Sequence, residues 1–422
     1  MIRVLAVADS DSYLKWAAGL LDAMPSDWVT ELLVVRSPIA PSESQIQAAV
    51  SGTRIGRAGR PAVSETPAGE GGGALPPVLA ARRLRRAAER FRPDVVLLAC
   101  TGPVVDVLAA EVLADLRPRP AFVSGLPGIS VPATEKAWLY RSGCELFVVH
   151  SGREAREFAA IGAALGGGGS AAGGGVALAR LPYLDLGGPA PAERDRVIFA
   201  TQAKVPRRRE ERETVLLALA ALAEARPDLD VVVKLRGRDS ERQTHIERHH
   251  YERLWLAMAG EGRVRVDALR FATGPMHEHL SRAAGFVTVS STAALEAIAA
   301  GVPLLVLSDF GVSAEMINLV FEGSGCLGTL DDLAKGGFRV PDPEWCRSNY
   351  FHDDAASDWL DRIRELAAAA REGALAISRS LLDGPEHAAA RRRARLRLEV
   401  PPRVLRYGYR AKRRVRRYLK AL

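Results

Sequence analysis

Residues 287–307, VTVSSTAALEAIAAGVPLLVL, join two apolar runs through a cluster of hydroxyl side chains, a helix of small residues and a Gly-Val-Pro turn. Short runs of branched apolar residues on both sides of a helical segment predict a strand–helix–strand unit of a parallel sheet. Ligands of such sheets bind beyond the carboxyl ends of the strands. The hydroxyls of Ser290, Ser291 and Thr292 are therefore expected at a ligand-binding edge.

The same alternation of strands and helices continues on both sides of this stretch and starts twice. One series starts at residues 2–8 (IRVLAVA) and a second at 196–202 (RVIFATQ). Further strands are expected at 28–35, 93–100, 119–125, 144–150, 228–237, 262–268 and 285–291. A chain of 422 residues also exceeds one ordinary domain of roughly 100–200 residues. These observations predict an α/β protein with two Rossmann-like domains that face a cleft.

Composition sets the expected domain boundaries. The run GGGGSAAGGG at 166–175 is too poor in side chains to pack, and we expect a flexible loop there. We therefore predict an N-terminal domain over 1–185 and a C-terminal domain over 195–385, closed by an Ala-rich helix at about 354–380. A basic amphipathic tail is expected over 386–422.

The net charge of +8 is concentrated in that tail. Residues 391–422 hold fourteen Lys or Arg and one acid, which leaves forty-four bases and forty-nine acids for the body. Apolar residues recur every three or four positions from Val404 to Leu422, with bases around them. Residues 391–422 could thus bind an anionic membrane surface. Nucleic acid is the less favoured partner, and a solvated tail or a helix packed on the body are the alternatives.

The remaining composition indicates a cytoplasmic protein. The N-terminus has one positive charge and a very short apolar run before Asp9, which is unlike a secretory signal. No apolar stretch approaches the roughly 18 residues of a membrane span. The four cysteines are scattered, so neither a disulfide framework nor a zinc site is expected. If the tail binds lipid, the protein is peripheral on the inner face of the plasma membrane.

The hydroxyl turn at 290–292, followed by LEAIAAGVP at 295–303, resembles the donor half of glycosyltransferases with the two-domain B-type fold, GT-B. The nearest resemblance is to capsule-polysaccharide and sialic acid or Kdo transferases, which carry an SS or SST turn and an upstream KPHP-like motif. It covers most of residues 196–325, whereas the N-terminal half agrees only in layout. The resemblance implies a nucleotide-sugar donor, a glycan or lipid-linked acceptor and a role in cell-surface polysaccharide synthesis.

The resemblance assigns donor-binding roles to eight residues. The hydroxyl turn would receive the nucleotide phosphate and Glu296 the ribose. In VVVKLRGR, Lys234 aligns with the family's lysine, but Arg236 stands where a phosphate-binding histidine is expected. A guanidinium also binds phosphate, so this role is compatible with the change. Gln202 and Lys204 follow the first strand of the second series, in a loop that lies against the donor phosphates in this family.

Ordinary structural roles are the alternatives for these residues. Ser291 or Thr292 could cap a helix, Glu296 could complement the helix dipole, and the cationic side chains could be solvated strand ends.

Catalysis by an inverting transferase needs a general base on the acceptor side. Asp9 and Asp11 follow the first strand and are the candidates; the alternative is that residues 10–12 only cap the next helix. Ser130, Thr134 and Glu135, in the loop LPGISVPATEK, are candidates for the acceptor site or belong to a simple connection.

No metal or other cofactor is expected, because no DxD-like metal triad occurs in a suitable loop and basic groups with helix dipoles can stabilise a leaving phosphate. His245, His249, His277 and His279 lack a third ligand at a convincing spacing. His150 is expected in a core or supporting role.

We hypothesise a glycosyltransferase of hexosyl or sialyl/Kdo type. The alternatives are a CDP-glycerol-type glycerophosphotransferase on the same scaffold and a catalytically silent nucleotide-binding protein attached by its basic tail. A Gly-Gly-rich turn, expected for a nucleotide-sugar 2-epimerase, is missing from SSTAALEA.

Overall fold

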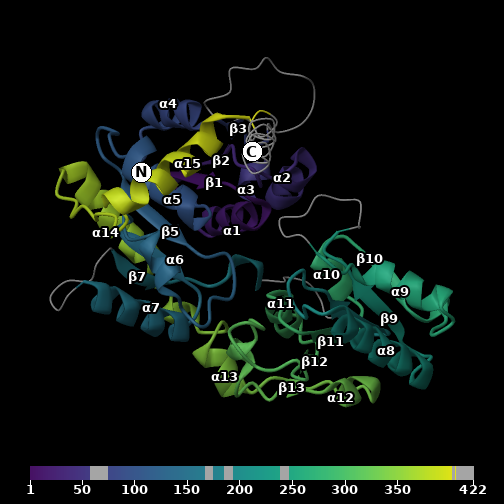
Figure 1. The fold of residues 1–422 in the computed structure, drawn as a ribbon. Helices are drawn as coiled ribbons and strands as arrows, with labels where there is room; N and C mark the ends of the chain where they lie inside the picture. The colour runs from purple at the N-terminus through teal and green to yellow at the C-terminus, as the bar shows by residue number, and fades with distance from the viewer. Residues whose placement is uncertain (58–74, 167–173, 185–192, 238–246, 402–403, 405–422) are drawn as a thin grey trace. The chain divides into compact units, whose positions relative to one another are not determined.

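The computed structural model describes residues 1–57, 75–166, 174–184, 193–237, 247–401 and Val404. These residues form two compact units, each built on one sheet (Figure 1). Unit 1 contains residues 1–127, 133–182 and 353–422, and unit 2 contains 128–132 and 183–352. The chain therefore leaves unit 1 after Pro182 and returns to it at Asp353.

The sheet of unit 1 has seven parallel strands in the order β3-β2-β1-β4-β5-β6-β7. Its strands run at β1 Arg3–Ala8, β2 Val29–Val35, β3 Val78–Leu79, β4 Val95–Ala99, β5 Ala121–Gly125, β6 Leu146–Val149 and β7 Gly175–Leu178. The strand order reverses between β1 and β4. This switch point is where a doubly wound sheet opens a crevice for a ligand.

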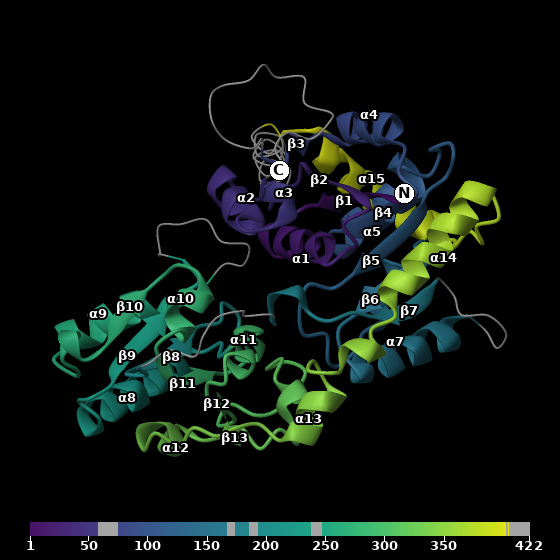
Figure 2. The same ribbon diagram turned by 180° about the vertical axis from the view of Figure 1, so that it is seen from behind.

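Helices cover both faces of this sheet, so its strands are apolar on both sides. Val4 and Ala6 of β1 pack in one core and Leu5 and Val7 in the other. The first core includes α1 (Asp11–Asp22), α2 (Glu43–Val50) and α14 (Trp359–Glu372). The second includes α4 (Ala81–Phe91), α5 (Gly102–Val107) and Leu398 of α15 (Pro385–Glu399). Figure 2 shows α14 alongside this sheet. The remaining helices of unit 1 are α3 Arg54–Arg57, α6 Glu135–Leu139 and α7 Gly152–Leu165.

The sheet of unit 2 has six parallel strands in the order β10-β9-β8-β11-β12-β13, with its switch point between β8 and β11. The strands run at β8 Arg196–Ala200, β9 Asp230–Lys234, β10 Arg270–Ala272, β11 Ala283–Thr288, β12 Leu304–Leu307 and β13 Leu327–Gly328. The helices are α8 Arg209–Ala225, α9 Tyr251–Gly260, α10 Met276–Leu280, α11 Ala293–Ala299, α12 Leu330–Ala334 and α13 Pro343–Ser348.

The predicted fold class, an α/β protein with two Rossmann-like domains, is confirmed. One predicted strand, residues 262–268, is wrong: the strand is the short β10 at Arg270–Ala272. Gly262 has a positive φ of 71° that ends the preceding helix, and Val266 lies in a 3-10 turn with its side chain exposed. The apolar residues at 264 and 266 thus imitate a strand pattern.

The C-terminal part of the chain differs most from expectation. The predicted boundary at 385 places residues 353–385 in the second domain, but they pack with unit 1. The Ala-rich helix is the shorter α14, whose Ile363 and Ala367 join the core of unit 1. Residues 386–399 of the predicted tail lie in the docked helix α15. The predictions for residues 167–173 and 405–422 fall on parts of the chain that the structure does not describe.

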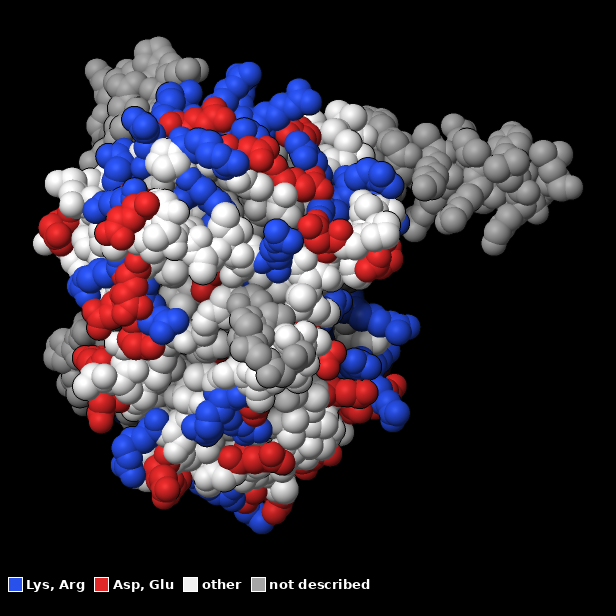
Figure 3. Space-filling model, turned by 90° about the vertical axis from the view of Figure 1, so that its left-hand side faces the viewer, with Lys and Arg blue, Asp and Glu red and all other residues white. Residues whose placement is uncertain are grey.

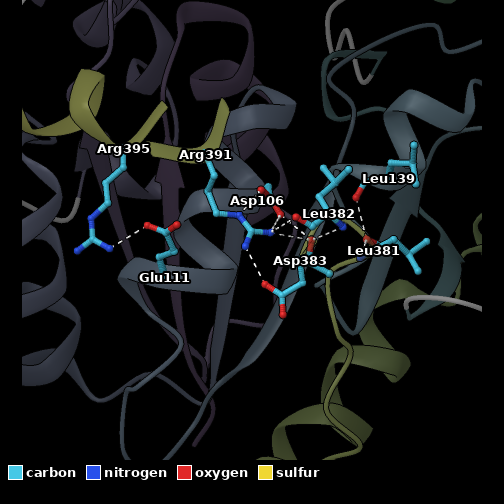
Figure 4. Close-up of polar contacts among 10 residues, drawn as sticks. Asp106, Glu111, Leu139, Leu381, Leu382, Asp383, Arg391 and Arg395 are labelled. Carbon is cyan, nitrogen blue, oxygen red and sulfur yellow. Dashed lines mark hydrogen bonds and ion pairs between the residues drawn. The ribbon is translucent and has the colours of Figure 1, made fainter. Parts of the chain in front are cut away.

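A buried ion pair fastens α15 to α5 (Figure 4). Arg391 Nε donates to Asp106 Oδ2 at 2.9 Å and Nη2 to Asp106 Oδ1 at 3.0 Å. Ser380 Oγ donates to the same carboxylate at 2.6 Å, and Arg391 also reaches Asp383 and the carbonyl of Leu382. We call these five residues the α15 latch.

None of the helices in the described part of the chain combines the length and the apolar character that a membrane span requires.

We expect Arg391→Ala to lower the free energy of unfolding by about 3–5 kcal/mol, because it leaves the carboxylate of Asp106 buried and unpaired. Arg395→Ala is the matched control: Arg395 lies one turn further along α15 and pairs with the more exposed Glu111. Its cost should stay below about 1 kcal/mol. Urea unfolding measures both, and equally small losses would mean that the latch does not stabilise the fold.

Candidate functional site

The carboxyl edge of the unit 2 sheet brings three predicted segments together. Because β9, β8 and β11 are neighbours, Lys234, the loop after Ala200 and the turn after Thr288 meet at one edge. Thr201 N donates to the carbonyl of Lys234 at 3.1 Å, and Thr288 Oγ1 donates to the carbonyl of Ala200 at 3.1 Å. These bonds tie the three strand ends to one another at the switch point.

The hydroxyl turn divides into one structural and two accessible residues. Ser290 is buried, and its Oγ donates to the carbonyl of Ile317 at 2.6 Å, which anchors the loop after β12. Ser291 and Thr292 are partly exposed. Ser291 Oγ accepts from Ala293 N at 3.2 Å, whereas Thr292 occupies the N-cap position without a side-chain capping bond. Thr292 is therefore the hydroxyl least occupied by local structure.

The other donor candidates surround this edge with different exposure. Lys234 is buried and its Nζ donates to the carbonyl of Leu235 at 2.7 Å, while Arg236 is exposed two residues later. Gln202 is partly exposed and Lys204 exposed. Glu296 is partly exposed in the first turn of α11.

Sequence reasoning missed the residue that organises the loop after β8. Arg212 of α8 is buried and donates to the carbonyls of Gln202 (3.1 Å), Ala203 (3.0 Å) and Pro206 (2.9 Å). It also pairs with the buried Glu247 and lies over the ring of Tyr251. One guanidinium thus fixes the loop that carries Gln202 and Lys204. Arg212 sits among other charged residues in REERETV, so nothing in the sequence singles it out.

In unit 1, the carboxyl ends of β1 and β4 surround Asp9. Its carboxylate is fully buried, and Oδ2 accepts from both the backbone N (3.0 Å) and the hydroxyl of Thr101. Oδ1 is screened from solvent and has no hydrogen-bond partner among the described residues. Burial raises the pKa of Asp9, and the bonds from Thr101 and the charge of Arg141 oppose that shift only partly.

Arg141 supplies the positive charge near Asp9 and was also missed from the sequence. It is buried, and its guanidinium donates to Tyr13 Oη at 2.7 Å, to the carbonyl of Gly125 at 3.1 Å and to the carbonyl of Cys100 at 3.3 Å. Burial raises the pKa of Tyr13 as well. An Arg in an ordinary helix–strand connection gives no sequence signal of such a role.

Asp11 is more exposed than Asp9, although its Oδ1 is likewise screened from solvent and has no hydrogen-bond partner among the described residues. It is the first residue of α1 and its Oδ2 pairs with Lys15 at 2.9 Å, in the (i, i+4) arrangement of an exposed helix pair. Ser10 occupies the N-cap position without a side-chain capping bond. Asp11 therefore stabilises the first turn of α1 through an ion pair, and the side-chain capping bond that was the alternative for residues 10–12 is not seen at this helix start.

The three acceptor-site candidates belong to two different units. Thr134 caps α6 by accepting from Ala137 N at 3.2 Å, and Glu135 is exposed in the first turn of that helix in unit 1. Ser130 belongs to the segment that packs with unit 2, where its Oγ donates to the carbonyl of Gly128 at 3.2 Å. A Cβ on Gly128 would lie 3.0 Å from Thr292 Oγ1, so this segment lies against the hydroxyl turn.

His150 and His279 have structural partners, whereas His245 lies outside the described residues. His150 is fully buried, with Nε2 accepting from Trp16 Nε1 at 2.7 Å and Nδ1 facing the carbonyl of Ala179 at 2.9 Å. Its predicted supporting role therefore agrees with its contacts. His279 Nε2 lies 3.0 Å from the carbonyl of Thr273. Within the described ranges, no group of three His, Cys, Asp or Glu side chains could hold a metal ion.

The family model described as "Putative glycosyltransferase (DUF6716)" matches residues 4–366, which is most of the chain. The chain belongs to the DUF6716 family. The match includes both switch-point edges and ends within α14. No curated protein matches it in sequence.

Solved structures similar to this DUF6716 protein show the same fold. A UDP co-structure of MnaA from S. aureus has 12% identity and a TM-score of 0.53, covering 90% of this chain and 99% of that one. A protein from Listeria monocytogenes described as a "putative UDP-N-acetylglucosamine 2-epimerase" has 13% identity and a TM-score of 0.51, with 88% of this chain and 96% of that one covered. An epimerase complex with UDP-GlcNAc and UDP from Methanocaldococcus jannaschii has 10% identity, a TM-score of 0.51 and 86% and 99% covered. At these identities, the similarity concerns the fold alone.

We expect Arg212→Ala to lower the free energy of unfolding of this DUF6716 protein by about 3–5 kcal/mol, since Glu247 stays buried without its partner. Arg209→Ala removes the exposed partner of Glu213 on the same helix and should cost less than about 1 kcal/mol. Denaturant unfolding of both variants tests the difference. Similar losses of unfolding free energy in both variants would contradict the organising role of Arg212.

Asp9→Asn should raise stability at neutral pH, because the raised pKa means that the folded state favours the protonated, neutral side chain. The wild-type carboxyl contributes its full stability below its unfolded pKa and loses it as pH rises through the higher folded pKa. The advantage of the Asn variant should accordingly shrink as pH is lowered toward 4 and disappear below it. Thermal unfolding between pH 3.5 and 8 measures this trend.

Asp11→Asn is the matched control for that series. It removes only an exposed pair with Lys15 and one first-turn charge, and it should lower stability by less than about 1 kcal/mol. An Asp9→Asn variant that is less stable than wild type at pH 7 would contradict the inferred cost of the buried carboxylate.

Proposed function

We propose that this DUF6716 protein transfers a sugar from a nucleotide-activated donor to a glycan or lipid-linked acceptor in the synthesis of cell-surface polysaccharide. One observation carries the proposal. Lys234, Gln202 and the Ser291–Thr292 pair come from three consecutive strands of one parallel sheet and meet at its switch point. A parallel sheet presents its ligand site at this place, and hydroxyl, amide and cationic donors suit a nucleotide phosphate.

The donor roles follow from exposure and chemistry. Arg236, Lys204 and Thr292 have solvent access and would contact the phosphates, with Lys234 adding a buried positive charge behind them. Glu296, one turn into α11, would accept the ribose hydroxyls. Ser290 would act by holding the loop after β12, since its hydroxyl donates to Ile317.

The reaction is a direct displacement at the anomeric carbon. The acceptor oxygen forms the new bond to this carbon, the bond to the phosphate oxygen breaks, and its electron pair leaves with the nucleotide. Asp9 or Asp11 takes the proton of the acceptor hydroxyl. Asp9 is favoured over Asp11, because burial raises the pKa of Asp9 toward the range of a working base, whereas Asp11 pairs with Lys15. Acceptor binding would have to uncover the buried carboxylate of Asp9.

The donor is a co-substrate, and no metal or other cofactor is part of the proposal. Cations and backbone dipoles at the switch point would balance the charge of the departing phosphate. The donor is of hexosyl or sialyl/Kdo type, and the protein works at the cytoplasmic side of the membrane. A glycerophosphotransferase would bind its donor at the same edge of the unit 2 sheet. A catalytically silent protein would bind the nucleotide at this edge, and Asp9 would have no catalytic role.

The first test is thermal unfolding of the wild type with CMP, CDP, UDP, GDP or ADP. A nucleotide that binds only the folded state stabilises it by about 2.7 kcal/mol at a hundredfold excess over Kd. One nucleotide should raise the Tm, and Arg236→Ala and Thr292→Val should each reduce that rise. Lys335→Ala, an exposed cation elsewhere on unit 2, serves as control and should respond like wild type.

The nucleobase that binds then selects the donor for a transfer assay. Asp9→Asn should retain nucleotide binding and lose transfer by at least about a hundredfold, the usual scale of a general base. Retained binding without any transfer by the wild type would favour the silent binder. No Tm rise with any nucleotide would overturn the proposed donor site.

A further inference from the structure

Helix α4 presents a row of arginines on the side that faces away from the core. Arg83, Arg86 and Arg90 are exposed and lie at i, i+3 and i+7, which places them on one face of the helix. Leu84 and Phe91 lie on the other side, in the core of unit 1. The sequence ARRLRRAAERF therefore separates its charges from its apolar residues.

Helix α15 lies beside α4 and has a similar outer face. The two helices are in contact, and Arg82 of α4 lies 3.9 Å from the carboxylate of Glu399. Arg392 and Arg393 are exposed on α15. Leu396, about one turn further along the helix, is 53% exposed. The α15 latch and Leu398 hold the opposite side of the helix against unit 1.

Two nearby acids are paired with other arginines, and the largely buried Glu31 interacts electrostatically with Arg3 and Arg90 without an ion pair among the described residues. Glu89 pairs with Arg85, and Glu111 pairs with Arg395. Five arginines consequently make no ion pair within the described part of the chain, and we call them the α4–α15 basic face: Arg83, Arg86, Arg90, Arg392 and Arg393. Figure 3 shows blue side chains, interspersed with red ones, gathered over the upper part of the molecule, where α4 and α15 lie.

A groove of about 450 Å³ borders α15 on the side of α6. Its walls include the apolar side chains of Leu139, Tyr140 and Leu382, and the cationic side chains of Lys136 and Arg393 line it as well. Cations beside an apolar groove suit a molecule with an anionic head and an apolar chain.

We propose that the α4–α15 basic face docks unit 1 on an anionic lipid bilayer, with Leu396 and the groove receiving apolar parts of the lipid. Arginine keeps its charge at any physiological pH, so contact depends on lipid charge and salt. Nucleic acid accounts for the arginines alone, whereas lipid also accounts for the exposed leucine and the groove. Residues 405–422 add eight Lys or Arg and no acid to the same end of the chain. The inference does not depend on the transferase activity.

Co-sedimentation of the full chain with vesicles tests this proposal. The protein should bind phosphatidylglycerol-rich vesicles and leave phosphatidylcholine vesicles unbound, and added salt should weaken binding. The variant Arg83→Glu/Arg86→Glu/Arg90→Glu should bind at least about tenfold more weakly, given the contribution of each base near an anionic surface. Arg392→Glu/Arg393→Glu should weaken binding in the same direction and serves as the second variant if the first does not fold.

The matched control is Arg207→Glu/Arg248→Glu/Arg347→Glu, which changes the net charge equally at three exposed positions of unit 2. It should bind less than about threefold more weakly than wild type, since these residues lie outside the proposed face. An equal loss in this control would reduce the effect to net charge and overturn the proposal.

Two further results would also overturn it. One is unchanged binding of the α4 variant while deletion of 405–422 abolishes binding, which would assign the contact to that segment alone. The other is wild-type binding to a short DNA duplex without binding to anionic vesicles, which would make nucleic acid the partner.

Discussion

Burial of both faces of each parallel sheet is the constraint on which the other features of this protein depend. Successive residues of β1 enter different cores, as Val4 and Leu5 do, and successive residues of β8 are buried in the same way. A strand that is covered on both sides has no face left for a polar site. Functional side chains are therefore restricted to the ends of the strands. Each candidate edge lies at a switch point, where the strand order of its sheet reverses.

The two edges solve the problem of placing charge near a buried sheet in different ways. At the edge of unit 2, the charge of Lys234 lies beside backbone carbonyls and Arg212 neutralises Glu247 while it binds three carbonyls of the neighbouring loop. At the edge of unit 1, Asp9 lies near Arg141 without a direct ion pair, so burial dominates and raises its pKa. An uncompensated carboxylate costs stability, as is common for groups kept for chemistry.

The end of the chain completes unit 1. Residues that follow unit 2 return through α14 to the first sheet and then through α15 to α5. The buried Arg391–Asp106 pair makes this return specific, because an arginine at another position of α15 would leave Asp106 unpaired. The same helix turns its remaining arginines outward. One element thereby closes the fold of unit 1 and gives it a charged surface next to α4.

Sequence alone determined the two-domain α/β fold, most of its strands and the polar turn at 290–292, because apolar runs and their spacing are local properties. It also placed Asp9 and Gln202 at strand ends. Only the tertiary structure decided that residues 353–399 belong to unit 1, that Ser290 is structural and that Ser130 and Thr134 belong to different units. The roles of Arg141, Arg212 and Arg391 were also evident only from the tertiary structure. Their importance comes from burial and from partners up to 285 positions away, and a contact at that separation leaves no pattern in the neighbouring sequence.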